Sequence, residues 1–189
     1  PANNLKELIA YAKGNPGKLS YGSAGFGTSG HLAGELFVYL TKTDITHVPY
    51  KGNSEAVTDL LGGRIQMMFS GPPPVLAFVA AGKLRAIAAA DYKRSAALPD
   101  VPTMAEQGLA DAESPAWYGI MAPIGVPASI LDRLNAEVHK AMARPEVQAK
   151  FAQLGINAQP NSRAEFRQMI TDETAKWKKL FAGRSIAID

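Results

Sequence analysis

Apolar residues recur at helical and strand spacings along the first half of the chain, and the two patterns alternate. The first segment has Leu5, Leu8, Ile9 and Ala12 on one helical face, after Asn4 as a candidate cap. The helical spacing predicts helices over 5–13, 29–40, 53–61 (capped by Asn53 or Ser54) and 75–81. Short apolar runs predict strands over 18–21, 45–48, 65–69 and 84–90.

This alternation predicts an α/β fold, with a parallel sheet and helices on both of its faces. The pattern changes after Asp91, where prolines and glycines punctuate the chain. A strand is then expected over 117–122, helices over 128–143, 145–154 and 162–181, and a last short strand over 186–188. The stripe formed by Leu131, Leu134, Val138 and Met142 predicts a buried helix face, and Trp117 and Tyr118 are expected to pack in a core or hinge.

Composition narrows the function classes only modestly. The chain has 189 residues, a net charge of +3 and no cysteine, which rules out disulfides and thiolate metal sites. Lysine and arginine are scattered, so no basic run indicates nucleic-acid binding. No stretch approaches the roughly 20 apolar residues of a membrane span, no metal-ligand spacing stands out, and no cofactor is implied. No signal peptide is visible either, so we expect that a leader was removed or that the native start lies upstream.

The strongest chemical signal is the glycine-rich loop at 22–30, between a predicted strand and a predicted helix. The unpaired N–H groups of a helix start favour anions, and glycines let a ligand approach the backbone. Thr28 and Ser29 add hydroxyl groups. The sequence therefore predicts an anion site here; a tight turn with an ordinary hydroxyl cap is the plainer interpretation.

Enzyme interpretations of the same loop meet specific obstacles. Gly25, Gly27 and Gly30 fit a dinucleotide fingerprint, but no acidic residue ends the next strand to hold a ribose. No lysine precedes the hydroxyl residues, as a P-loop requires. The run at 27–31 resembles a nucleophile elbow, except that His31 stands where the last glycine belongs. His31 is expected to shape the loop or to donate to a ligand.

Two further loops follow predicted strands. In the loop at 49–54, Lys51 could supply a cation and Tyr50 an apolar wall with a hydroxyl, or the lysine is simply solvated. The loop at 70–74 follows the third strand. Parallel sheets bind ligands at the carboxyl ends of their strands, so the three loops are expected to share one site.

At these loops the chain resembles the receptors of tripartite tricarboxylate transporters, also called Bug-type receptors. The resemblance covers essentially the whole chain and is carried by several motifs in order: 19–25, 27–35, 48–52, 60–63, 81–86, 98–103 and 117–119. It implies a periplasmic-binding-protein-like (type II) architecture in which a small ligand lies between two α/β lobes.

The resemblance also implies site residues and partners. A carboxylate would be held at the helix start by Ser23, Ala24, Gly27, Thr28 and Ser29, with Tyr50, Lys51 and Gly52 nearby. Many relatives have an aspartate after the third strand where this chain has Ser70, so plain dicarboxylates or aromatic carboxylates are favoured over amino acids. The implied location is the periplasm, and the implied partners are a small organic anion and the membrane permease subunits.

Family members extend about a hundred residues further upstream, a stretch that includes the main ligand loop of the first lobe and one hinge strand. We therefore expect a complete second lobe at 1–115 and, at 116–189, a hinge strand and helices returning to an incomplete first lobe. Apolar surface left exposed would favour self-association. The expected function is a solute receptor and not an enzyme; a nucleotide-binding or hydrolytic α/β enzyme and a fragment that binds nothing stay open.

Overall fold

The strand β1 (Leu19–Ser23) lies in the middle of a three-stranded parallel sheet, between β2 (Ile45–Pro49) and β3 (Met67–Met68). Leu19 pairs with Ile45 at one end of β1, and Tyr21 pairs with Met67. The computed structural model describes residues 2–156 and 158–182, which fall into two compact units, 2–116 and 117–182. The sheet belongs to the first unit.

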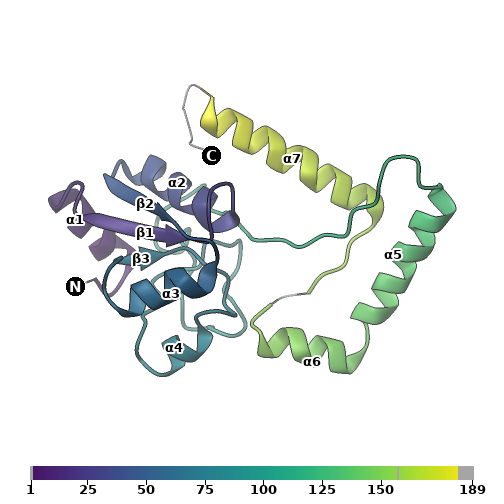
Figure 1. The fold of residues 1–189 in the computed structure, drawn as a ribbon, viewed down its shortest axis with the longest axis horizontal. Helices are drawn as coiled ribbons and strands as arrows, with labels where there is room; N and C mark the ends of the chain where they lie inside the picture. Colours follow the sequence, from purple (N-terminus) through teal and green to yellow (C-terminus); the bar gives the residue numbers. More distant parts are fainter. Residues whose placement is uncertain (1, 157, 183–189) are drawn as a thin grey trace. The chain divides into compact units, whose positions relative to one another are not determined.

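Helices cover both faces of this sheet, as the alternating pattern predicts (Figure 1). The first unit contains α1 (Leu5–Gly14), α2 (Ser29–Thr41), α3 (Asn53–Leu61) and the short α4 (Leu76–Ala80). Neighbouring residues of a strand point to opposite faces. Tyr21 accordingly points to α2, where a Cβ on Gly34 would lie 2.1 Å from its ring, and Gly22 faces Ala56 of α3.

The main core lies between α1, α2 and β1. Its largest fully buried side chains are Tyr21, Phe37 and Leu5. Residues distant in the chain complete it: Met104 and Ala112 are buried in the same cluster, and the backbone N–H of Leu5 donates to Gln107 Oε1 at 2.9 Å. The first unit is thus tied together by contacts across its whole length.

Two predicted strands of the first unit are wrong or shorter than expected. The segment 84–90 is not a strand: its only ladder contact is the single bridge from Ala89 to Thr103 within the described chain, and the Gln107 side chain binds the Ile87 carbonyl. β3 is confined to two residues because the Gln66 side chain takes over the ladder position, accepting from the Ser20 N–H at 2.9 Å.

The second unit consists of α5 (Ala128–Met142), α6 (Pro145–Gln153) and α7 (Arg163–Phe181), close to the predicted bounds. The strand expected at 117–122 is wrong: this segment has no partner strand among the described residues, and Tyr118 is 88% exposed. Trp117 does pack, with its ring 5.4 Å from that of Phe166 in an edge-on contact. The short strand expected at 186–188 lies outside the described residues.

The apolar stripe of α5 is not buried, against expectation. Leu134 is 50% exposed, and no residue of α5, α6 or α7 is buried. An apolar stripe predicts which face of a helix can be buried, but burial needs another helix or sheet to pack against that face. The described part of this unit provides few such contacts.

Helix caps were predicted with mixed success. Asn4 caps α1 by accepting from the Glu7 N–H, as expected, and Ser162 forms a capping box with Glu165 at α7. The expected cap of α3 by Asn53 or Ser54 is wrong, because Gly52 occupies the cap position without a side-chain bond.

Candidate functional site

The glycine-rich loop links β1 to α2 and carries the start of that helix to the carboxyl end of the sheet. Thr28 is the N-cap of α2; its hydroxyl donates to the Gly25 carbonyl at 2.7 Å and accepts from the His31 N–H at 3.4 Å. The only hydroxyl proton of Thr28 is therefore already used inside the loop. Thr28 shapes the helix start and does not offer a donor to a ligand in this arrangement.

The first turn of α2 is open. Ser29 is exposed, and neither its hydroxyl nor the N–H groups of Ser29 and Gly30 have a hydrogen-bond partner in the described chain. Three unpaired donors therefore lie at the positive end of a 13-residue helix, an arrangement that favours anions. Gly30 is required here by space, since a Cβ would lie 2.5 Å from the Phe69 carbonyl oxygen.

Beneath the loop lies a layer of stacked rings. The imidazoles of His31 and His47 stack with their centroids 4.2 Å apart, and His47 stacks in turn on Tyr21 at 4.8 Å. Phe26, from the loop itself, meets both imidazoles edge-on at 5.5 and 5.2 Å. This layer supports the loop from the sheet side.

Hydrogen bonds fix the imidazole layer to the loop. The Gly27 N–H donates to Nδ1 of His31 at 3.0 Å, and Nε2 of His47 lies 2.7 Å from Ser23 Oγ. Glu35 lies 4.0 Å from Nε2 of His31 and accepts a 2.8 Å bond from the Tyr21 hydroxyl. His31 is 2% exposed and thus shapes the loop, one of the two roles expected of it.

Burial sets the protonation of this layer. It lowers the pKa of His31, a shift that Glu35 partly opposes. Burial, and then the neighbouring His31, lower the pKa of His47 to about 4. Burial and the bond to Glu35 raise the pKa of Tyr21. Both imidazoles are consequently neutral at pH 7.

Ser23 and Ala24 lie at the base of the loop. The Ser23 side chain is fully buried, with its hydroxyl bonded to the Gly25 backbone as well as to His47. Ala24 is half-buried, and Gly27 is exposed with a φ of +72°, a left-handed conformation that favours glycine. Ser23 therefore builds the loop from inside, while Gly27 lies on its surface.

The loop after β2 adjoins the glycine loop. The Tyr50 N–H donates to the Ser23 carbonyl at 3.0 Å, and a Cβ on Gly25 would lie 3.2 Å from the Tyr50 carbonyl oxygen. The Tyr50 hydroxyl donates its proton to Asp59 of α3 at 2.9 Å. Lys51 is exposed, and its ammonium group has no ion pair among the described residues; Gly52 follows as the helix cap.

The loop after β3 reaches the same edge of the sheet through Phe69, whose carbonyl touches Gly30. Ser70 itself is exposed, and its hydroxyl donates to the adjacent Gly71 carbonyl at 2.9 Å. The structure thus brings the three predicted loops together at the carboxyl ends of parallel strands, where such sheets bind ligands.

Sequence reasoning missed three residues that build this edge: Phe26, Glu35 and His47. Glu35 follows His31 by four positions, a spacing that places two side chains on one helix face, so the signal was present. His47 is in register with Tyr21 across the sheet, which only strand pairing reveals.

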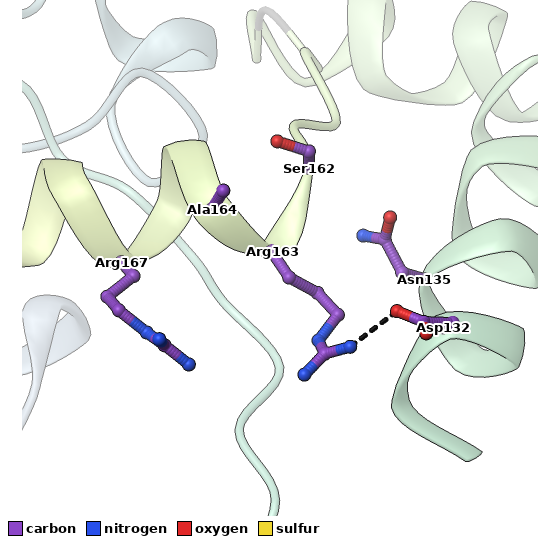
Figure 2. A pocket seen from close by; sticks show the side chains of 6 residues that line it. All are labelled: Asp132, Asn135, Ser162, Arg163, Ala164 and Arg167. Carbon is purple, nitrogen blue, oxygen red and sulfur yellow. Dashed lines mark hydrogen bonds and ion pairs between the residues drawn. The ribbon is translucent and has the colours of Figure 1, made fainter. Parts of the chain in front are cut away.

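The second unit contains an open pocket of about 390 Å³ at the start of α7, shown in Figure 2. Asp132, Asn135, Ser162, Arg163, Ala164 and Arg167 line it. Arg163 is paired with Asp132 across it, and the Ser162 hydroxyl is committed to the helix cap. The best-placed cation and the helix start are therefore both already neutralised.

Metal and membrane features are absent from the part of the chain that the structure describes. No three His, Asp or Glu side chains gather there as metal ligands would. None of the described helices has both the length and the apolar character needed to span a bilayer.

Relatives of known sequence match nearly the whole chain. A protein encoded between tcbD and tcbE in Pseudomonas sp. strain P51 is 40% identical over 178 residues, which are 94% of this chain and 53% of that protein. Protein BugT of Bordetella pertussis is 35% identical, over 93% of this chain and 54% of its own length. The chain thus spans about half the length of the curated relatives it matches.

Solved structures agree with these relatives. The Rpa4515 protein of R. palustris with adipate has a TM-score of 0.88 and 32% identity, covering 96% of this chain and 61% of its own. The periplasmic binding protein BugD has a TM-score of 0.86 and 33% identity, with 96% and 62% covered. MatC of Rhodopseudomonas palustris with bound malate has a TM-score of 0.84 and 29% identity, with 95% and 62% covered.

These structures confirm the predicted α/β class and its likeness to periplasmic binding proteins. The model of the tripartite tricarboxylate transporter family receptor matches residues 1–186. The chain belongs to this family of transporter receptors, as its loop motifs indicated.

Proposed function

We propose that this chain is part of an extracytoplasmic solute receptor that captures a small organic carboxylate at the start of α2. The observation that carries the proposal is the open first turn, where the Ser29 hydroxyl and the N–H groups of Ser29 and Gly30 lack partners in the described chain. Carboxylate oxygens accept such hydrogen bonds, and the helix dipole adds to the attraction.

Neighbouring side chains support an acidic ligand without an amino group. Lys51, exposed and unpaired in the described chain, lies in the adjoining loop and would attract a second carboxylate. Ser70 has no charge with which to hold an ammonium group. Adipate and malate, bound by two structurally similar proteins, have this chemistry, so dicarboxylates are the first ligands to test, with tricarboxylates and aromatic carboxylates after them.

An enzymatic role has less support. Ser23 and His47 are 2.7 Å apart and look like a nucleophile with its base, but the Ser23 side chain is fully buried, so no ester carbonyl could reach it. The strand β2 ends in Pro49 and not in a ribose-binding carboxylate, which argues against a dinucleotide.

The wider system follows from the family. Since this chain matches about half of its relatives, delivery to membrane permease subunits and a periplasmic location are proposed for the whole receptor. We further propose that 1–115 corresponds to one complete lobe and 116–189 to the hinge and part of the other. Capture by the single lobe would then be weaker than capture between two lobes that close.

Calorimetric titration with succinate, malate, citrate, adipate and terephthalate tests the proposal. We expect at least one of them to bind, and Ser29→Ala to weaken that binding by about 1–2 kcal/mol, the cost of one hydrogen bond to a charged group. Ser129→Ala is the matched control, since Ser129 is likewise an exposed serine in the first turn of a helix.

Three other results would each favour an alternative. Binding of NAD without any response to carboxylates would favour the nucleotide enzyme, and hydrolysis of model esters the hydrolase. No binding by a folded chain would indicate a fragment that binds nothing alone; sedimentation analysis would show whether it self-associates instead.

A further inference from the structure

The stacked histidines beneath the glycine loop are not among the groups proposed to contact the anion. His31 comes from α2 and His47 from β2, so the pair joins two elements that bound the site. His31 is 2% exposed, and every buried side-chain nitrogen and oxygen of the described residues has a hydrogen-bond partner. The two imidazoles are therefore held in place by packing and hydrogen bonds.

The bond from the Gly27 N–H fixes the state of His31. A backbone N–H can only donate, so Nδ1 must be unprotonated and the ring proton must lie on Nε2. Nε2 points toward Glu35, 4.0 Å away, which favours this tautomer. Gly27 and Thr28 immediately precede Ser29, so this bond fixes the backbone that ends in the open donors.

A second proton on His31 would remove this bond. Nδ1–H would then face Gly27 N–H, donor against donor. The titratable groups that face the imidazole are Glu35 on its own helix and His47 on β2. Tyr21 on β1 lies close by, because its hydroxyl donates to Glu35 and to the His31 backbone carbonyl. Glu35 would partly offset the new charge, whereas a protonated His47 with its ring centroid 4.2 Å away would oppose it.

We propose that His31 is a positioning residue that holds the glycine loop in its anion-binding shape through unprotonated Nδ1, and that acid releases the loop and weakens capture. This inference rests on the proposed function for its ligand, but its structural half concerns the loop alone. The coupling makes the receptor sensitive to acid although neither histidine of the pair is proposed to touch the anion.

The matched variants are His31→Asn and His31→Leu. The amide oxygen of Asn lies close to the place of Nδ1 and can accept from Gly27, but it cannot be protonated; Leu fills space and accepts nothing. Binding of malate and adipate is measured by calorimetry at pH 7.5 and pH 5.0. Because the ligands titrate too, each variant is compared with wild type at the same pH.

We expect His31→Asn to stay within about threefold of wild type at pH 7.5 and to bind more tightly than wild type at pH 5.0, by up to about fivefold, the worth of one hydrogen bond. His31→Leu should bind about fivefold more weakly at pH 7.5. An unchanged ratio of His31→Asn to wild type at the two pH values would overturn the proposal.

A measurement without ligand separates this proposal from the function it rests on. Nitrogen-15 NMR of wild type reads the tautomer of His31 directly, and hydrogen exchange reads the Gly27 amide. We expect the Nε2–H tautomer at pH 7.5 and a loss of Gly27 protection as His31 takes up a proton. A proton on Nδ1 at pH 7.5, or Gly27 protection unchanged through that titration, would contradict the proposal whether or not any carboxylate binds.

Discussion

The two units are stabilised by interactions of different range. In the first, Leu5, Tyr21 and Phe37 are at most 1% exposed and pack with Met104 from far along the chain. In the second, no described residue is buried, and Ile124 and Tyr118 are almost fully exposed. A core of distant residues holds the first unit, whereas the described part of the second has exposed ion pairs and the capping box of α7 in place of a core.

This difference explains where a site can form. The open turn of α2 keeps its geometry because buried rings, a neighbouring strand and two further loops fix it. The pocket at the start of α7 has a helix start and two arginines but no buried support. Preorganised donors need a rigid shell behind them, and only the first unit provides one among the residues described.

The largest expected contrast comes from removing one apolar side chain in each unit. Phe37→Ala should lower the free energy of unfolding of the first unit by about 3–5 kcal/mol, because it leaves a cavity in the core. Leu134→Ala, at a half-exposed position, should cost less than about 1 kcal/mol. Urea titration measures both free energies of unfolding. Hydrogen exchange of β1 reports on the first unit, and the fluorescence of the two tryptophans, which both lie in the second unit, reports on the second. Equal costs would contradict the contrast.

A second comparison uses two glycines with the same crowding. A Cβ would lie 2.1 Å from the Tyr21 ring at Gly34 and 2.2 Å from the Phe166 ring at Gly119. Gly34→Ala should cost about 2–3 kcal/mol, because Tyr21 is locked in the core. Gly119→Ala should cost less than about 0.5 kcal/mol, because the half-buried Phe166 can turn away. The same urea titrations measure both costs. If Gly119→Ala lowered the free energy of unfolding as much as Gly34→Ala, the second unit would be as rigid as the first.

Acid should destabilise the first unit selectively. His47 has its pKa lowered to about 4 from an ordinary 6.5, so the unfolded chain binds the proton first as pH falls. Stability is complete above pH 6.5, declines from there to about pH 4, and then levels off. We expect the free energy of unfolding to fall by about 2 kcal/mol. This is less than the full pKa shift of His47 implies, because the ring is partly exposed. His47→Gln should reduce this slope in urea titrations at several pH values, and the remainder should come from His31, whose pKa is also lowered. An unchanged slope in this variant would contradict the role of His47.

The smallest expected effect is local. Ser162→Ala removes the capping box of α7 and should cost about 1 kcal/mol, visible as faster hydrogen exchange in the first turn of that helix. Exchange in β1 should stay unchanged. A loss of protection in both units would mean that they unfold together.

The sequence was informative about the fold wherever structure is local. The helix bounds and the cap by Asn4 follow from spacing and from side chains a few residues apart. The predictions were wrong where the structure of a segment depends on what it packs against. The segment 84–90 is as apolar as a strand, but it bonds to the Gln107 side chain and to the backbone of 102–104. The apolar stripe of α5 is not buried by any other part of the described chain. Apolar spacing indicates what a segment can bury, not what is there to cover it.

The open turn of α2 was predictable from the sequence, but its hydrogen bonds were not. Glycines and hydroxyls between a strand and a helix indicated the open turn of α2. The sequence could not show that Thr28 uses its proton on Gly25, that Tyr50 donates to Asp59, or that His47 lies beneath the loop. Such assignments depend on hydrogen-bond geometry and strand register, so the ligand-binding roles of the loop residues stay predictions.

Amide NMR during titration with malate or adipate tests most directly whether the anion binds at the start of α2. We predict that the backbone amides of Ser29 and Gly30 shift first and furthest, while those at the start of α7 stay still. Shifts concentrated around Arg163 and Arg167, with Ser29 and Gly30 unmoved at saturation, would place the anion in the second unit and contradict the proposed site.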